Sequence, residues 1–155
     1  MKKITNWRNA TVGDLEADAL LDDATLIHVL CCEMQDGKAV TIQGEQEGRI
    51  KAFFDYHINN GIPVVFHNGI GYDIPLVEKL FGYDLSELMV IDTLYLSWYL
   101  NFNRMKHGLD SFFEDYGIAK PKIDDWENLS REEYVNRCQE DVKINKALWD
   151  DLKGR

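Results

Sequence analysis

The chain has 155 residues, of which 45% are hydrophobic and 12% aromatic, and a formal net charge of −10. This length predicts one compact domain over residues 1–155, and the composition excludes intrinsic disorder. The net negative charge argues against a protein that binds nucleic acid or an anionic membrane through overall electrostatic attraction. Bound divalent cations would nevertheless let an acidic chain act on phosphates.

The first part of the chain is typical of three strands followed by a helix. Apolar patterning predicts strands over residues 10–17, 25–34 and 39–42, and Asp36-Gly37 between the last two indicates a hairpin turn. Apolar residues at helical spacing from Gln46 predict a helix that ends at Asn60-Gly61. The chain therefore opens as an antiparallel meander.

Strands and helices then alternate. Residues 62–66 are typical of a buried strand, and HNGIGYDIPLVEKLFG follows as a glycine-containing turn into a helix that Asp73 would cap. Residues 88–91 predict a fifth strand, and Asp92-Thr93 leads into a helix through Leu100; further helices are expected over residues 109–116 and 131–152. This order predicts an α/β fold, with a mixed sheet of about five strands and helices packed against it.

The cysteines and the N-terminus indicate a compartment. Cys31 and Cys32 would point to opposite faces of one strand, and Cys138 leaves an odd count, so we expect reduced thiols rather than a disulfide framework. The opening MKKITNWRNATV lacks the apolar run of a signal peptide, and no stretch approaches membrane-spanning length. We therefore expect a cytoplasmic protein that contacts no membrane.

Two carboxylates interrupt the first predicted strand. Asp14 and Glu16 are two residues apart, so both side chains should project from the same face of the sheet. Two like charges at a half-buried position require a cation or a shared proton. The structural alternative is an edge strand with a solvated acidic face.

Two further aspartates occur where a core or a turn is expected. On the last predicted helix, Asp141 shares a stripe with Tyr134, Cys138, Asn145, Leu148 and Leu152, on the face that should be packed. We expect Asp141 to be paired, neutral or bound to metal, the structural alternative being an ion pair with lysine or arginine. Asp73 lies in a strand-to-helix turn, where α/β proteins often place ligand sites, but an N-cap role alone would explain it, as it would Asp92.

Together these elements supply four carboxylates that could converge on one point. Hard oxygen ligands suit Mg²⁺ or Mn²⁺. Two such ions about 4 Å apart would activate water and stabilise the leaving oxygen of a phosphodiester. We therefore interpret the charge on the first strand as part of a metal site.

The motifs resemble, in their order, those of the DEDD superfamily of 3′-to-5′ exonucleases. They are Asp14-x-Glu16, HNGIGYD with Asp73, the IDT segment at 91–93, and RCQED with Asp141, and the resemblance runs from about residue 11 to residue 150. It is closest to the proofreading domains of phage family A DNA polymerases. The resemblance implies an RNase H-like fold with a five-stranded mixed sheet, in a bacterium or a phage-infected cell.

The resemblance also implies roles for particular residues. Asp14, Glu16 and Asp141 would ligate one metal ion. Asp14 would also reach a second ion, which Asp73 would hold directly or through water.

Substrate contacts follow from the same resemblance. Asn68 and the backbone from Ala17 to Leu20 would contact the terminal nucleotide. His67 and His107 are more typical of structural histidines.

The sequence departs from the family at the residue that orients or deprotonates the attacking water. Members carry a histidine five residues before the last aspartate or a tyrosine four residues before it, and these positions hold Asn136 and Arg137 here. Asparagine can hydrogen-bond water but cannot take its proton, whereas Arg137 is suited to a phosphate. Tyr134 lies about 10 Å along the helix from Asp141 and is a poor substitute. We expect a metal site with reduced turnover. Three explanations stay open: the metal ions alone activate the water, another residue such as His107 takes the role of the base, or the site is inactivated.

These inferences predict a metal-dependent 3′-to-5′ exonuclease that hydrolyses single-stranded DNA to 5′-mononucleotides. One alternative is a ribonuclease on short RNA, because the same carboxylates serve both sugars. Another is a nucleic-acid-binding module of weak or no activity. The sequence ends just after its last predicted helix, so we expect a free-standing exonuclease or an excised domain, with a polymerase or another replication protein as a candidate partner.

Basic residues are scattered rather than clustered. Three of them precede the first predicted strand, namely Lys2, Lys3 and Arg8, and four fall in the segments around the helical tail, namely Arg104, Lys106, Lys120 and Lys122. Contact with a nucleic-acid backbone is one alternative, and dispersed surface charge is the favoured interpretation. The excess negative charge predicts weak, distributive engagement of long strands.

Overall fold

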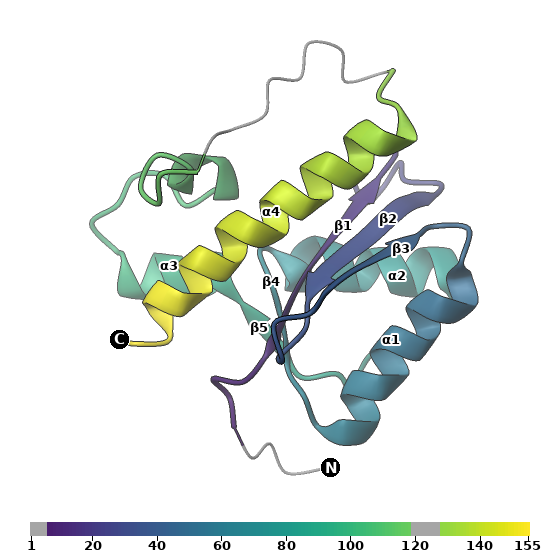
Figure 1. The fold of residues 1–155 in the computed structure, drawn as a ribbon, viewed down its shortest axis with the longest axis horizontal. Coiled ribbons are helices and arrows are strands. Elements are labelled where there is room, and N and C mark those ends of the chain that lie inside the picture. The colour runs from purple at the N-terminus through teal and green to yellow at the C-terminus, as the bar shows by residue number, and fades with distance from the viewer. Residues whose placement is uncertain (1–5, 119–127) are drawn as a thin grey trace.

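A five-stranded mixed sheet forms the centre of the protein (Figure 1). The structure is a computed structural model that describes residues 6–118 and 128–155, so Lys2, Lys3, Lys120 and Lys122 lie outside the described residues. The strands are β1 (Thr11–Ala17), β2 (Ile27–Glu33), β3 (Ala39–Gln43), β4 (Val64–Phe66) and β5 (Val90–Asp92), in the spatial order β3-β2-β1-β4-β5. β1, β2 and β3 pair antiparallel, and β4 and β5 add in parallel on the other side of β1, which confirms the predicted fold class.

Helices cover both faces of this sheet. α1 (Glu47–Asn60) and α2 (Ile74–Phe81) pack against one face, around a core that includes Phe54, Phe66 and Leu76. α4 (Arg131–Leu152) runs diagonally across the other face, and α3 (Thr93–Leu100) lies beside the C-terminal half of α4 (Figure 1). The result is three layers with the sheet in the middle.

The pleat of β1 decides which of its side chains meet α4. Leu15 belongs to the core under α1 and α2, whereas Val12 belongs to the core under α4. Because successive side chains alternate between faces, Asp14 and Glu16 follow Val12 onto the α4 side. The predicted pair of carboxylates on one face is therefore confirmed, and the face is covered by a helix rather than open to solvent.

The start of α4 is fixed by a reciprocal capping arrangement. The Ser130 hydroxyl accepts a hydrogen bond from the Glu133 amide at 3.1 Å, and the Glu133 carboxylate accepts one from the Ser130 amide at 3.2 Å. These contacts satisfy two amide groups that a helix start leaves unpaired. α4 then continues without interruption for 22 residues, which carries its polar residues across the sheet.

The cysteines follow the same alternation. Cys31 and Cys32 lie on opposite faces of β2, and Cys138 lies on α4; all three are buried free thiols, as expected. Within residues 6–118 and 128–155, no helix has the length and apolar character needed to cross a bilayer.

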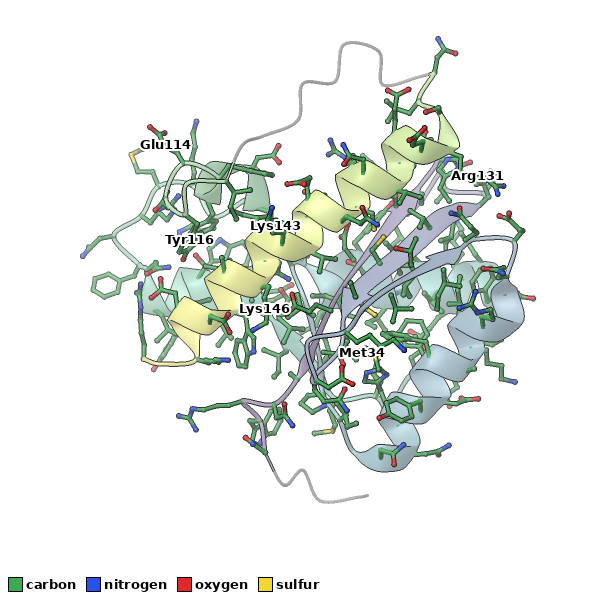
Figure 2. All side chains as sticks on the ribbon, in the orientation of Figure 1. Met34, Glu114, Tyr116, Arg131, Lys143 and Lys146 are labelled. Carbon is green, nitrogen blue, oxygen red and sulfur yellow. The ribbon has the colours of Figure 1, made fainter. Side chains whose placement is uncertain are left out.

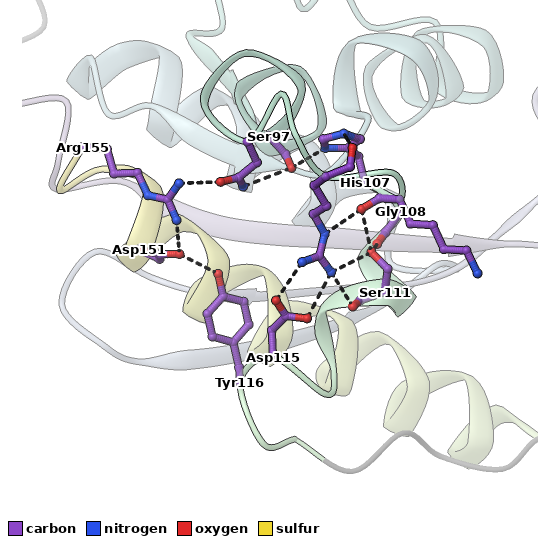
Figure 3. A network of polar contacts seen from close by, with 11 residues as sticks. Ser97, His107, Gly108, Ser111, Asp115, Tyr116, Asp151 and Arg155 are labelled. Carbon is purple, nitrogen blue, oxygen red and sulfur yellow. Dashed lines mark hydrogen bonds and ion pairs between the residues drawn. The ribbon is translucent and has the colours of Figure 1, made fainter.

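The helix predicted over residues 109–116 is wrong. The structure has only a 3₁₀ turn, η2 (Leu109–Phe112), followed by irregular turns. Side chains satisfy the backbone here: the Ser111 hydroxyl donates to the Gly108 carbonyl at 2.6 Å, which competes with helical pairing (Figure 3). Arg104 holds the segment together, since its guanidinium pairs with Asp115 at 2.7 Å and lies 4.0 Å from the Phe112 ring centre. Arg104 is thus committed to this segment rather than available to a nucleic-acid backbone.

Candidate metal centre

The C-terminal half of β1 and the middle of α4 face each other at the site. Within the β1–β2 ladder Asp14 lies opposite Cys31 and Glu16 opposite Val29, and the register shifts directly after Glu16. From α4, the Cys138 thiol donates a hydrogen bond to the Asp14 main-chain carbonyl at 3.3 Å. This contact fixes the position along β1 at which α4 crosses the strand.

Two more α4 side chains meet Glu16. The Arg137 guanidinium Nε lies 3.5 Å from the Glu16 carboxylate, and the two side chains are only 23% and 16% exposed. Asp141, one helical turn beyond Arg137, hydrogen-bonds the Glu16 carboxyl group. The packed stripe predicted on this helix therefore places Asp141 beside the carboxylates of β1.

The fourth carboxylate enters from the turn after β4. This turn, η1 (Gly69–Asp73), is a five-residue π-helical turn that runs directly into α2. The predicted N-cap role of Asp73 is wrong: its side chain makes no capping hydrogen bond, and Pro75 in the first turn of α2 has no amide proton to donate to it. Instead the Asp73 carboxylate, 3% exposed, accepts a hydrogen bond from the Leu15 amide at 3.2 Å. The turn thus directs Asp73 at β1.

Burial and mutual repulsion govern the charges of this cluster. Burial raises the pKa of Asp14 well above its usual range, and the negative charges of Asp141, Glu16 and Asp73 raise it further. Burial and the Asp141 charge raise the pKa of Glu16 from 4.5 to about 8, against the opposing effect of Arg137. Burial also raises the pKa of Asp73, although the Leu15 amide works in the other direction. The four carboxylates therefore interact, and their ionised forms require a compensating cation.

The residues present fit a hard divalent cation. Among the described residues, Asp14 Oδ2 is buried and has no hydrogen-bond partner, which leaves an acceptor oxygen inside the cluster. Ligand atoms of Asp14, Glu16 and Cys138 lie within 4.8 Å of one another. Burial raises the pKa of the Cys138 thiol well above its usual range, and its proton is already donated to a carbonyl. The carboxylate oxygens are thus the donor set, and they suit Mg²⁺ or Mn²⁺.

The segment carrying Asn68 is held by Asp92. The Asp92 carboxylate caps α3 by accepting from the Leu94 amide at 3.0 Å, as its N-cap interpretation predicted. It also accepts from the Asn68 amide at 2.9 Å and the Ile70 amide at 3.1 Å, which sequence reasoning missed. A β-carbon at Gly69 would lie 2.4 Å from Phe66 Cβ, so only glycine allows this close turn.

The loop after β1 is also anchored next to the carboxylates. The Asp18 carboxylate accepts from the Thr25 amide at 2.9 Å, and the Tyr72 hydroxyl donates to the Ala19 carbonyl at 2.8 Å. Leu20 is 80% exposed on this loop. The backbone from Ala17 to Leu20 therefore has a fixed place beside the site, while its contact with a nucleotide stays a prediction.

The two histidines have structural partners. His67 Nδ1 lies 2.9 Å from the Thr93 hydroxyl, which also contacts Asn145 Oδ1 of α4 at 2.6 Å. His107 lies 2.7 Å from the Ser97 hydroxyl and 2.8 Å from the Arg104 carbonyl, so both of its ring nitrogens are engaged (Figure 3). Thr93 and Asn145 link α3 to α4, and sequence reasoning missed this link.

Asn136 and Arg137, the two positions at which this sequence departs from the family motif, point in different directions from α4. Arg137 is about 40° from Asp141 around the helix axis and reaches Glu16, whereas Asn136 is about 140° away. Asn136 is exposed. Arg137 is thus inside the carboxylate cluster, and Asn136 is at its solvent side.

Comparison with known proteins gives a family and a set of relatives. A family model of the RNase H superfamily matches residues 13–127. The PolC-type DNA polymerase III of Mycoplasma pneumoniae is 36% identical over 109 residues, which are 68% of this chain and 6% of that polymerase. The DNA-directed DNA polymerase of Escherichia phage T7 is 30% identical over 99 residues, 59% of this chain and 14% of the polymerase. The chain therefore spans a small part of either polymerase.

A solved structure shares the fold. Brucella melitensis NrnC superposes with a TM-score of 0.68 at 20% identity, covering 100% of this chain and 78% of that one. Structures of NrnC with bound Mg²⁺ and bound to pGG match similarly, with TM-scores of 0.66. At this level of identity the likeness concerns the fold.

Proposed function

The chain belongs to the RNase H superfamily, and on that basis we propose that it is a metal-dependent 3′-to-5′ exonuclease acting on single-stranded DNA. The observation that carries the proposal is the cluster of four interacting carboxylates around Asp14 Oδ2, an oxygen with no hydrogen-bond partner in the part of the chain that the structure describes. A buried cluster of this kind is costly for a fold unless it binds cations.

We assign the metal ligands by their place in the cluster. Asp14, Glu16 and Asp141 would hold one divalent ion, and Asp14 and Asp73 a second. When bound, Mg²⁺ or Mn²⁺ would activate water and stabilise the leaving oxygen of a phosphodiester. The Leu15 amide keeps Asp73 aimed at β1, and the Cys138 contact holds α4 against Asp14, so the ligands are positioned before metal arrives.

Relatives support the substrate class. Two of them are DNA polymerases, which favours DNA and a polymerase or other replication protein as a partner. The NrnC structure bound to pGG keeps short RNA as the second candidate substrate. Substrate would meet Arg137 through a phosphate, and Asn68 and the backbone from Ala17 to Leu20 through the terminal nucleotide.

A gel assay with end-labelled single strands tests the proposal. With Mg²⁺ or Mn²⁺, a 5′-labelled strand should give a ladder that shortens with time, while a 3′-labelled strand should release labelled mononucleotide at once. Chelator should stop both reactions. Cleavage that starts at the 5′ end, or that persists in chelator, would contradict the proposal, and matched DNA and RNA strands decide the preferred sugar.

Metal titration separates an enzyme from a binding module. Calorimetry should detect Mn²⁺ binding that disappears when Asp14 and Glu16 both become alanine. Strand binding without any Mn²⁺ binding would favour the non-catalytic module.

Arg137→Gln is expected to lower strand hydrolysis about tenfold, because it removes a charge-assisted hydrogen bond worth about 1.4 kcal/mol to the phosphate. The same change should tighten Mn²⁺ binding measured by calorimetry, because the guanidinium beside Glu16 repels the incoming cation. Arg49→Gln, on the exposed face of α1, is the matched control. Weaker Mn²⁺ binding by Arg137→Gln would show that Arg137 organises the ligands instead.

Asn136→His is expected to raise the rate of strand hydrolysis about tenfold, below the full effect of a well-placed base because position 136 lies round the helix from Asp141. The gain should follow the protonation of the new imidazole, with a rise between about pH 6 and 7.5. Asn136→Gln, which cannot take a proton, should keep the original rate. An unchanged rate in Asn136→His would remove Asn136 from the chemistry.

A further inference from the structure

A groove lies at the end of the sheet where α4 begins. Its volume is about 540 Å³, and its lining includes Leu26, His28, Phe81, Leu129, Arg131 and Tyr134. Figure 2 places Arg131 at the first turn of α4, beside the strand ends. We propose that this groove binds an unpaired nucleobase of the strand whose 3′ end occupies the carboxylate site, an inference that rests on the proposed function.

The groove and the carboxylate cluster are built on neighbouring residues of β2 and α4. His28 precedes Val29, the residue opposite Glu16 in the β1–β2 ladder. Tyr134 precedes Arg137 by three residues, so the two lie about one turn apart on neighbouring positions of α4. Tyr134 at the groove therefore lies about 5 Å along the helix from Arg137, which contacts Glu16 of the cluster. A strand held at the carboxylates would therefore pass the groove with its next nucleotide.

The groove presents an aromatic surface. The rings of His28 and Tyr134 stack with centroids 3.9 Å apart and an interplanar angle of 17°. Burial lowers the pKa of His28 below its ordinary value, although Asp18 opposes this, so the ring is predominantly neutral at neutral pH. Stacked neutral rings offer a flat face to a base of any sequence.

The charges around the groove favour a base over a phosphate. Arg131 is paired with Glu45 at 2.7 Å, so its charge is offset where it faces the groove. Asp18 lies close enough to influence His28, and the chain as a whole carries a net charge of −10. A phosphodiester backbone gains little in such a field, whereas leucine, phenylalanine and tyrosine side chains provide apolar contacts for a base.

Steady-state hydrolysis of short strands with one abasic residue, moved stepwise from the 3′ end, tests the proposal. In the unmodified protein, an abasic residue at the position that reaches the groove should raise KM about tenfold, the loss of one base–aromatic stack. Tyr134→Ala should raise KM by a similar factor on the intact strand, with little change in kcat. On the abasic strand Tyr134→Ala should add nothing further, because both changes remove the same contact.

Two variants keep the result specific. Tyr134→Phe retains the ring and should behave as the unmodified protein, and Tyr99→Ala removes an exposed aromatic ring from α3 and should have no effect. Because Tyr134 packs against the core under α4, Tyr134→Ala is checked by thermal unfolding. If it unfolds, His28→Ala takes its place, with the same expected rise in KM.

The outcomes separate this inference from the nuclease proposal. Efficient cleavage with no position-dependent effect of the abasic residue, or with additive effects of the residue and Tyr134→Ala, would overturn the groove and leave the nuclease intact. If no strand is cleaved with metal, the nuclease proposal fails. In that case, fluorescence anisotropy measures the binding of the same abasic strands, each carrying a dye label. Binding that does not depend on the position of the abasic residue would overturn the proposal for the groove as well.

Discussion

Asp14→Asn is expected to lower metal-dependent strand hydrolysis about a thousandfold or more, a loss of about 4 kcal/mol in transition-state stabilisation. Asp14 interacts with all three other carboxylates, and its Oδ2 has no donor within the described residues. An amide presents one oxygen in place of two and carries no charge, so it cannot serve two ions. The rate of hydrolysis of end-labelled strands, measured with Mg²⁺ and with Mn²⁺, gives the size of this loss.

The same variant should become more stable while it becomes inactive. In chelator at pH 8, replacing a buried, repelled carboxylate by a neutral amide should raise the free energy of unfolding by about 2 kcal/mol. Urea unfolding measures this gain, and Asp22→Asn, at an exposed position of the loop after β1, should alter neither activity nor stability. A stability loss in Asp14→Asn would mean that Asp14 holds the fold together, and the fall in activity would then say nothing about metal.

The fold was predictable because its elements have strong local signals. Alternation in residues 10–17 predicted that Asp14 and Glu16 share one face of the sheet. Asn60-Gly61 predicted the end of α1, and Gly61 there adopts a left-handed conformation with φ 63°. The 109–116 segment was not predictable from periodicity, because its conformation depends on contacts of Arg104 and Ser111 that lie outside the helical repeat. Tertiary contacts overrode a weak helical pattern there.

The metal ligands of the candidate site were predictable from the sequence, whereas the contacts that position these ligands were less so. Four carboxylates at unusual positions signalled the cluster, since buried charge needs a partner. The turn that directs Asp73 was misread as a cap, because a π-helical turn running into α2 has no distinct pattern. The double role of Asp92 and the contact between Arg137 and Glu16 depend on distances between remote segments, which spacing along one chain does not contain.

The metal-free protein is expected to lose stability as pH rises from 6.5 to 8, in contrast to proteins whose buried carboxylates are paired. Burial and the Asp141 charge raise the pKa of Glu16 from 4.5 to about 8 in the folded state. The folded state therefore binds the Glu16 proton more tightly than the unfolded state does. Glu16 contributes its full stabilisation below pH 4.5, and this contribution is lost as pH rises toward 8. Glu16 alone should therefore lower the free energy of unfolding by about 2 kcal/mol across the measured window.

The window from pH 6.5 to 8 avoids the titrations of the buried histidines and of the ion-paired Asp115. His28, His57 and His67 have lowered pKa values because of burial, so they destabilise the fold only as pH falls below about 6.5. Asp115 has a lowered pKa through Arg104, and its contribution is lost only in acid, near and below 3.8. Asp14 and Asp73 shift in the same direction as Glu16 and can only steepen the decline.

Metal should reverse this trend, because the ionised cluster is the form that binds a cation. Mn²⁺ at a hundred times its dissociation constant should restore about 2.7 kcal/mol at pH 8, and less at pH 6.5, where protons compete for the carboxylates. Urea unfolding in chelator and in Mn²⁺ at both pH values measures the four free energies. Glu16→Gln should flatten the metal-free decline, whereas Asp36→Asn, in the β2–β3 hairpin, should leave it intact. A metal-free protein that is equally stable at pH 6.5 and 8 would mean that water reaches the carboxylates freely, and the desolvated cluster on which the nuclease proposal depends would not exist.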